Sequence, residues 1–175
     1  MYTDYKELKN EVRKLITEKD IYYLKRAVIL AENALNQGEE PFGSLLVSHN
    51  DVVLFEDYNR VSDGDHTRHP EFEIARWAAN HMTPENRKLA TVYTTGEHCP
   101  MCAAAHGWVG LGRIVYASSS QQLDEWRQVY QWPESPVESL PIKAIIRHAN
   151  VDGPVELLSE EIKQLHIQSH QRKFK

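Results

Sequence analysis

The chain has 175 residues, of which 41% are hydrophobic and 26% charged, and its 20 basic and 25 acidic side chains give a net charge of −5. These values are typical of one globular domain and exclude a disordered or fibrous chain. No apolar run is long enough to span a membrane and the N-terminus lacks the apolar segment of a secretory signal, so we expect a cytoplasmic protein with no membrane partner. The acidic balance makes a nucleic-acid partner unlikely, because such partners usually require a basic surface.

The first part of the chain predicts two helices. Apolar residues from Tyr5 to Ile16 recur at helical spacing, which indicates an additional N-terminal helix within residues 1–19. Asp20 suits the N-cap of a second helix, and Gly38 suits its end.

From the second helix onward, strands and helices alternate in a pattern typical of α/β proteins. We expect strands at residues 44–47, 52–55, 91–94, 113–117 and 141–147, and helices at residues 21–36, 69–81, 99–109, 123–130 and 155–171. Five strands interleaved with helices imply one five-stranded mixed sheet covered on both faces, which is a three-layer α/β/α sandwich. We expect the whole chain, residues 1–175, to form this single domain.

Two short motifs carry the chemistry that the sequence predicts. In Cys99-Pro-Met-Cys102, a helix start places both sulfurs on one face, since residues i and i+3 are neighbours on a helix. One imidazole added to two thiolates makes a three-ligand zinc site with an open fourth position, where zinc lowers the pKa of a bound water to about 7. His69-Pro70-Glu71 offers that imidazole, and its carboxyl can reach such a water and move the water's proton.

Both motifs place proline at the first position of a predicted helix, where this residue is favoured. The positive ends of the two helix dipoles would then meet at the metal and favour thiolate. Two other interpretations stay open on these residues alone. Cys99 and Cys102 could form a redox pair, or they could belong to a closed structural zinc site with His98 or His106 as the fourth ligand.

H-x-E followed by C-x-x-C is the signature of zinc-dependent base deaminases, and the chain resembles the cytidine-deaminase-like superfamily from about Asp20 to its last helix. Residues 38–47 are similar to the loop and first strand that precede the site in purine-acting members. Residues 58–61 resemble the segment whose asparagine hydrogen-bonds the base, and residues 65–71 resemble the Asp-Pro-Thr-x-His-Ala-Glu run of bacterial guanine deaminases. The guanine deaminase branch matches best, and tRNA adenosine deaminases come next.

The resemblance implies roles for individual residues. Glu71 would be the proton shuttle, and Asn59 would recognise the base, because a side-chain amide offers both a donor and an acceptor. Phe42 would form part of the pocket wall. The ligands of one Zn²⁺ per chain would be His69, Cys99 and Cys102.

The sequence departs from the pattern of the family at three positions. His98 stands where members commonly have proline, so its imidazole is a candidate substrate contact beside the zinc ligands. Pro70 replaces a frequent alanine and removes one N–H that could face the substrate. Gln122, with Asp124 and Glu125 close by, stands where guanine deaminases carry an acidic residue, and its amide can hydrogen-bond but cannot hold a proton.

The four tryptophans and Glu73 complete the set of candidates. Trp126 and Trp132 follow the fourth strand, where family members place pocket-closing residues, and Trp126 could stack on the substrate. Trp77 and Trp108 fall inside predicted helices and are expected in the core. Glu73 should point away from the site.

The sequence therefore predicts a zinc-dependent hydrolase that releases ammonia from a small amino-substituted heterocycle, first of all a purine base such as guanine. One alternative is a tRNA adenosine deaminase with the same metal chemistry. Another is a non-catalytic zinc-stabilised interaction domain, which would have four protein ligands. The resemblance also implies a homodimer and a small-molecule partner rather than a nucleic acid.

Overall fold

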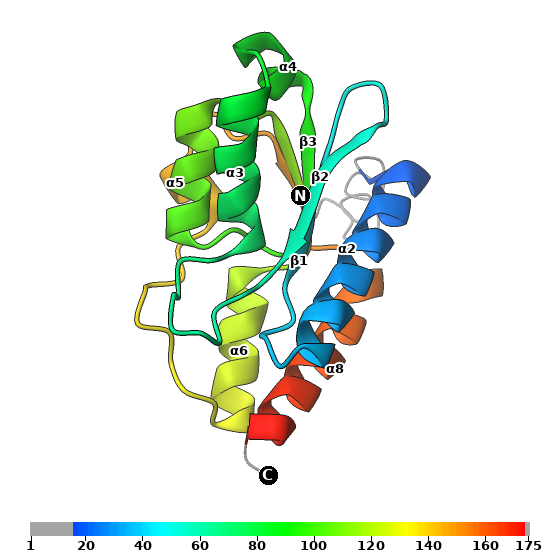
Figure 1. Cartoon of the computed structure of the whole chain (residues 1–175). Helices are drawn as coiled ribbons and strands as arrows, with labels where there is room; N and C mark the ends of the chain where they lie inside the picture. Colours follow the sequence, from blue (N-terminus) through cyan, green and yellow to red (C-terminus); the bar gives the residue numbers. More distant parts are fainter. Residues whose placement is uncertain (1–15, 174–175) are drawn as a thin grey trace, which may run out of the picture.

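The computed structural model describes residues 16–173, so the helix expected around residues 5–16 lies outside the described residues except for its last position. Helices lie on both sides of a central sheet (Figure 1), which confirms the expected α/β/α sandwich. The described elements are α2 (Glu18–Asn36), β1 (Gly43–Val47), β2 (Val53–Tyr58), α3 (Pro70–His81), α4 (Pro84–Leu89), β3 (Thr91–Gly96), α5 (Pro100–Val109), β4 (Arg113–Ser118), α6 (Ser120–Tyr130), α7 (Ile142–Ile145), β5 (Val151–Asp152) and α8 (Glu156–Lys173).

The five strands lie in the order β2-β1-β3-β4-β5. Strand β1 is antiparallel to both of its neighbours, β2 and β3, whereas β3, β4 and β5 run parallel. The sheet is therefore mixed. Helix α5 connects the parallel pair β3 and β4, so the carboxyl end of β3 leads directly into the first turn of α5.

The two faces of the sheet are covered by different helices. Alternate residues of β1 serve the two layers, since Leu45 packs in a core with α2 and α8, and Leu46 packs in a core with α3. In Figure 1, α3 and α5 lie on the left of the sheet and α2 and α8 on the right. The layer formed by α3 and α5 contains the two motifs, because these helices begin at residues 70 and 100.

Helix α2 begins slightly earlier than expected. Its N-cap is Thr17 rather than Asp20, and Asp20 occupies the third helical position. The Thr17 side chain accepts a hydrogen bond from the Asp20 backbone N–H, and the Asp20 carboxylate accepts one from the Thr17 N–H. This is a capping box, in which the threonine three residues upstream is the better start signal.

Strand β1 passes unusually close to α2 at Gly43. A Cβ atom at this position would lie 2.6 Å from the backbone nitrogen of Ala31, closer than real Cβ contacts come. Glycine is therefore required for the packing of β1 against α2.

The prediction of a strand at residues 141–147 is wrong. This segment forms the short helix α7, and the fifth strand is β5, only two residues long. Ile142, Ile145 and Ile146 are spaced i, i+3 and i+4, which favours a helix, and Ile142 is fully buried against Ala103 of α5. Helix α4, which the sequence does not predict, has six residues and is capped by the side chain of Thr83.

The prediction that Trp77 and Trp108 lie in the core is wrong for Trp108 and holds in part for Trp77. Trp108 is 90% exposed on the outer side of α5, so its assignment to the core is wrong. Trp77 is half-buried and stacks between Phe55 and His81. Within residues 16–173, no helix combines the length and the apolar character needed to cross a membrane.

Candidate metal centre

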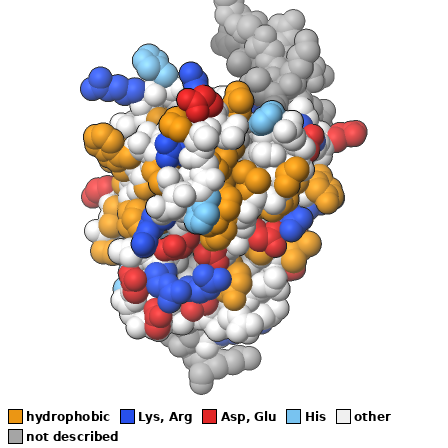
Figure 2. Space-filling model, turned by 45° about the horizontal axis from the view of Figure 1, so that its top comes forward, with side chains coloured by type: hydrophobic (Ala, Val, Ile, Leu, Met, Phe, Trp, Pro, Cys, Tyr) orange, Lys and Arg blue, Asp and Glu red, His pale blue; other side chains and the backbone are white. Residues whose placement is uncertain are grey.

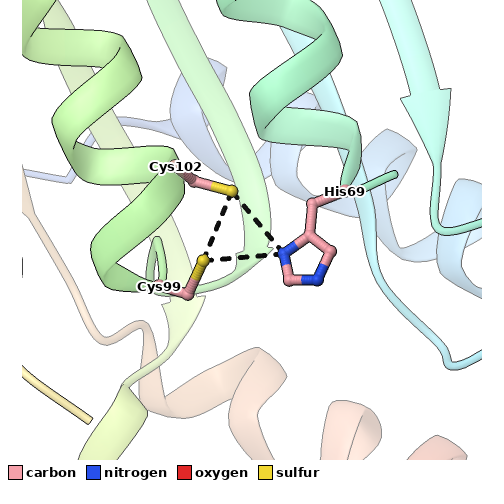
Figure 3. A group of neighbouring side chains, drawn as sticks. All are labelled: His69, Cys99 and Cys102. Carbon is pink, nitrogen blue, oxygen red and sulfur yellow. Dashed lines mark hydrogen bonds between the residues drawn. The ribbon is translucent and has the colours of Figure 1, made fainter. Parts of the chain in front are cut away.

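Two helix starts meet at the candidate site. His69 is the N-cap of α3 and Cys99 the N-cap of α5, both in extended backbone conformation. Pro70 and Pro100 follow at the first helical positions, as the sequence predicts. Neither N-cap side chain makes a capping hydrogen bond. Instead, both side chains point toward the space between the two helices (Figure 3).

The donor atoms of His69, Cys99 and Cys102 form a nearly equilateral triangle. The two sulfurs are 3.5 Å apart, and each lies 3.6 Å from His69 Nδ1. A tetrahedral zinc ion with bonds of about 2.3 Å to sulfur and about 2.1 Å to nitrogen would separate these atoms by about 3.8 Å and 3.6 Å. The triangle therefore fits zinc. Among the described residues, the group of possible ligands has these three members, which is the set of an open rather than a closed site.

The charges around the triangle already favour a thiolate. The contact between the Cys99 and Cys102 sulfurs, supported by His69, lowers the pKa of Cys99 to about 4 against the effect of burial. Burial lowers the pKa of His69, but the neighbouring Cys99 and Glu71 outweigh it and raise that pKa. The contact with Cys99 and burial raise the pKa of Cys102 well above its usual value, so metal binding would displace protons from Cys102 and His69.

Glu71 lies beside the triangle without belonging to it. Its side chain is 6% exposed, and its Oε2 is 3.9 Å from Cys102 Sγ. Its other oxygen, Oε1, accepts hydrogen bonds from Ser44 and Thr94 at 2.9 and 2.7 Å. Burial raises the pKa of Glu71, although His69 and the Thr94 hydroxyl oppose the shift. A carboxyl with a raised pKa at this distance can both accept and donate a proton.

Phe42 and Asn59 lie together at the open end of the antiparallel pair β1 and β2, just before β1 and just after β2. The Asn59 backbone N–H donates to the Phe42 carbonyl at 3.0 Å. The Asn59 side chain is 1% exposed, and within the described residues neither its Oδ1 nor its Nδ2 has a hydrogen-bond partner. Buried amides are normally satisfied, so this pair of atoms is available to a ligand.

The structure gives His98 and Gln122 structural neighbours. His98 is fully buried edge-on against His106, and burial holds its pKa well below the ordinary value, so its ring is neutral. His106 Nε2 contacts the Gly112 carbonyl at 3.0 Å, so neither histidine joins the triangle as a fourth ligand. Gln122 Oε1 accepts from the Ser119 N–H in the capping box of α6, which leaves its amide nitrogen to meet other groups.

Trp126 is buried on α6, in the core shared with α2 and α8. Its ring contacts His166 of α8, which is edge-on to Phe42 with ring centroids 5.0 Å apart. These three rings therefore form one aromatic group next to the proposed pocket wall. His166, which the sequence did not single out, gives no local signal because its place depends on how α8 packs.

Comparisons with known proteins agree with this geometry. The family model described as "Cytidine and deoxycytidylate deaminase zinc-binding region" matches residues 17–118, more than half of the chain. A probable cytosine deaminase of Schizosaccharomyces pombe is 37% identical over 110 residues, which cover 62% of this chain and 65% of the relative. Guanine deaminase of Bacillus subtilis is 32% identical over 97 residues, which cover 55% of this chain and 62% of that protein. The matches thus span less than two thirds of the length of each relative.

A solved structure from a study of A-to-I editing by tRNA:A34 deaminases has the same fold. Its TM-score is 0.56 at 22% sequence identity, and the match covers 83% of this chain and 99% of the other. This likeness supports the arrangement of the sheet and helices.

Proposed function

Since the chain belongs to the family of the cytidine and deoxycytidylate deaminase zinc-binding region, we propose that it is a zinc-dependent hydrolase that removes the amino group of a free nucleobase as ammonia. The carrying observation is the position of Glu71, next to the three ligands but outside the ligand set. A purely structural zinc site would have no use for a buried carboxyl at this place.

His69, Cys99 and Cys102 would hold the metal, which when bound supplies a water acidic enough to lose a proton near neutral pH. Glu71 Oε2 would take that proton and deliver it to the ring nitrogen beside the amino-bearing carbon. It would then deliver the second proton of the water to the departing amine. The base gains a carbonyl oxygen in place of its amino group, and ammonia leaves.

We propose that Asn59 and Phe42 bind the base. The unpaired amide atoms of Asn59 would hydrogen-bond the edge of the heterocycle, and Phe42 would line the pocket. Trp126 would support that wall through His166. His98 would line the base-binding pocket as a neutral ring. The Gln122 amide nitrogen remains a candidate hydrogen-bond donor to the base.

Two observations suggest which base is the substrate. The run over residues 65–71 favours guanine, and the relative from Schizosaccharomyces pombe adds cytosine as a candidate. Charge favours a free base over tRNA, since acidic and basic side chains are intermixed on the face shown in Figure 2 and the net charge is −5. We also propose a homodimer whose contact covers the exposed Trp108 of α5.

The test is ammonia release by the zinc-loaded protein from guanine, adenine, cytosine, their nucleosides and an adenosine-containing tRNA hairpin. We expect turnover of one free base. Turnover of the hairpin alone would identify a tRNA deaminase, and zinc binding with no turnover on any substrate would favour the non-catalytic domain.

The matched pair Glu71→Gln and Glu73→Gln tests the role of the carboxyl. E71Q should bind zinc and lose turnover by roughly 10²–10⁴-fold, the usual share of general acid–base catalysis. E73Q should keep its activity, because Glu73 is partly exposed and pairs with Arg76. An active E71Q variant would contradict the mechanism.

A further inference from the structure

The face of the sheet beneath α3 is apolar except for one row of residues. Asp57 of β2, Ser44 of β1 and Thr94 of β3 are directly opposite one another in register, and all three are buried. Two positions further along, Leu46 and Val92 belong to the apolar core under α3. The polar row therefore lies only where the first turn of α3 begins.

The two hydroxyls of this row converge on a single atom. Ser44 Oγ is 2.9 Å and Thr94 Oγ1 2.7 Å from Glu71 Oε1, and the two hydroxyl oxygens are 2.8 Å from each other. Thr94 Oγ1 also lies 3.1 Å from the Gly96 carbonyl. Contacts of 2.7 Å are typical of a hydroxyl that donates to a carboxylate.

Both hydroxyls are completely buried, at 0% exposure. Burying a hydroxyl opposes folding unless the group is hydrogen-bonded, and alanine or valine would fill these strand positions without that penalty. Folding of the sheet alone therefore gives no reason for hydroxyls at 44 and 94. Their contact with Glu71 does.

The contact also determines how the carboxyl is oriented. With Oε1 fixed from the sheet side, the planar carboxyl group directs Oε2 toward Cys102 Sγ and the triangle of ligands. The sheet therefore holds Oε1, and Oε2 is the oxygen that faces the three ligands.

We infer that Ser44 and Thr94 are positioning residues for Glu71, which hold Oε1 so that Oε2 faces the three ligands and the reacting groups. This inference rests on the proposed function for its kinetic consequence. Its structural content concerns only the orientation of Glu71.

The experiment compares S44A, T94V and the double variant S44A/T94V with T94S, which keeps the hydroxyl. Thr91→Val is the matched control on the same strand, because Thr91 lies at the far end of β3. For the zinc-loaded proteins we expect T94V to lose about tenfold and the double variant about 100-fold in kcat, with KM within about twofold of the original. T94S should recover most of the loss, and T91V should show none.

Crystal structures of the original protein and the double variant provide a readout that needs no turnover. We expect the Glu71 carboxyl to leave its position in the double variant while the three ligands stay in place. A carboxyl that remains within about 0.5 Å of its position, or a kcat within about threefold, would overturn the inference. If the original protein deaminates none of the bases, the proposed function fails, and the crystal structures still decide the inference.

Discussion

Two side chains at the metal centre occupy N-cap positions without capping. Ser, Thr, Asp and Asn are the residues that usually stabilise a helix N-terminus, yet α3 and α5 begin with His69 and Cys99, and neither makes a capping bond. The helices thus forgo about 1 kcal/mol of capping each, and both side chains remain available to a metal. This choice is consistent with a site selected for binding rather than for helix stability.

Removal of one ligand should abolish metal binding. Cys102→Ala leaves two ligands, which is too few for a stable zinc site, so we expect bound zinc to fall from about one per chain to a small fraction of that. Atomic absorption after dialysis measures the content. His66→Ala is the control, because His66 is an exposed histidine in the loop before the site. A C102A variant with full zinc content would refute the ligand assignment.

The sequence was informative about the site where the signal is local. The three ligands and the carboxyl lie in two short motifs, residues 69–71 and 99–102. The position of these motifs at helix starts predicts the triangle and the carboxyl beside it. Ser44 and Thr94 could not be found in this way. Their contact depends on the register of β1 and β3, which no short motif specifies.

At the level of elements, Asp20 connects α2 to two strands. Its buried carboxylate accepts from the Thr17 N–H in the capping box, from the Tyr93 hydroxyl of β3 and from the Arg113 guanidinium of β4. Arg113 also pairs with Asp152 of β5. One buried ionic network therefore joins α2 to the end of the sheet opposite the metal centre.

This network should make stability depend on pH. Burial raises the pKa of Asp20, but the hydrogen bonds from Arg113, Thr17 and Tyr93 outweigh it and leave the pKa below the ordinary value. The stabilisation is therefore present above about pH 4 and is lost as the pH falls through the folded-state pKa. Asp20→Asn should cost roughly 3 kcal/mol in the free energy of unfolding at pH 7, measured with urea, and less at acid pH.

Asp51→Asn is the matched control for this prediction. Asp51 forms an exposed ion pair with Lys19, so its replacement should change the unfolding free energy little at either pH. A D20N variant with the same stability difference at pH 7 and in acid would show that the charge of Asp20 is not responsible.

The element that sequence reasoning placed wrongly has a physical explanation. Residues 141–147 are apolar enough for a strand, but Ile142 and Ile145 are spaced for a helix, and the true last strand has only two residues. Val151 and Asp152 pair with β4 because the preceding segment brings them there, and a two-residue strand has no periodicity to detect.

At the scale of the whole molecule, α5 presents an unusual outer face. The helix contains no Asp, Glu, Lys or Arg, and Met101, Ala104 and Trp108 form one stripe at helical spacing, with Trp108 90% exposed. An exposed tryptophan on an uncharged helix is a common feature of protein–protein contacts. The proposed homodimer would cover this stripe.

Sedimentation velocity tests this proposal. We expect the original protein to sediment as a dimer and Trp108→Glu to sediment as a monomer, because the charge would be buried in the contact. Val129→Glu, which replaces another exposed apolar residue on α6, should leave the mass unchanged. A monomeric original protein, or a dimeric W108E variant, would exclude this contact.

The missing side chain at Gly43 links the far layer of the molecule to the chemistry. Gly43 lies between Phe42, the proposed pocket wall, and Ser44, which donates to Glu71. Because β1 packs directly on the α2 backbone at this position, a shift of α2 would reach both neighbours of Gly43. A substitution in α2 that displaced β1 would therefore also displace Ser44, and with it the hydrogen bond that holds the Glu71 carboxyl, although α2 itself makes no contact with that group.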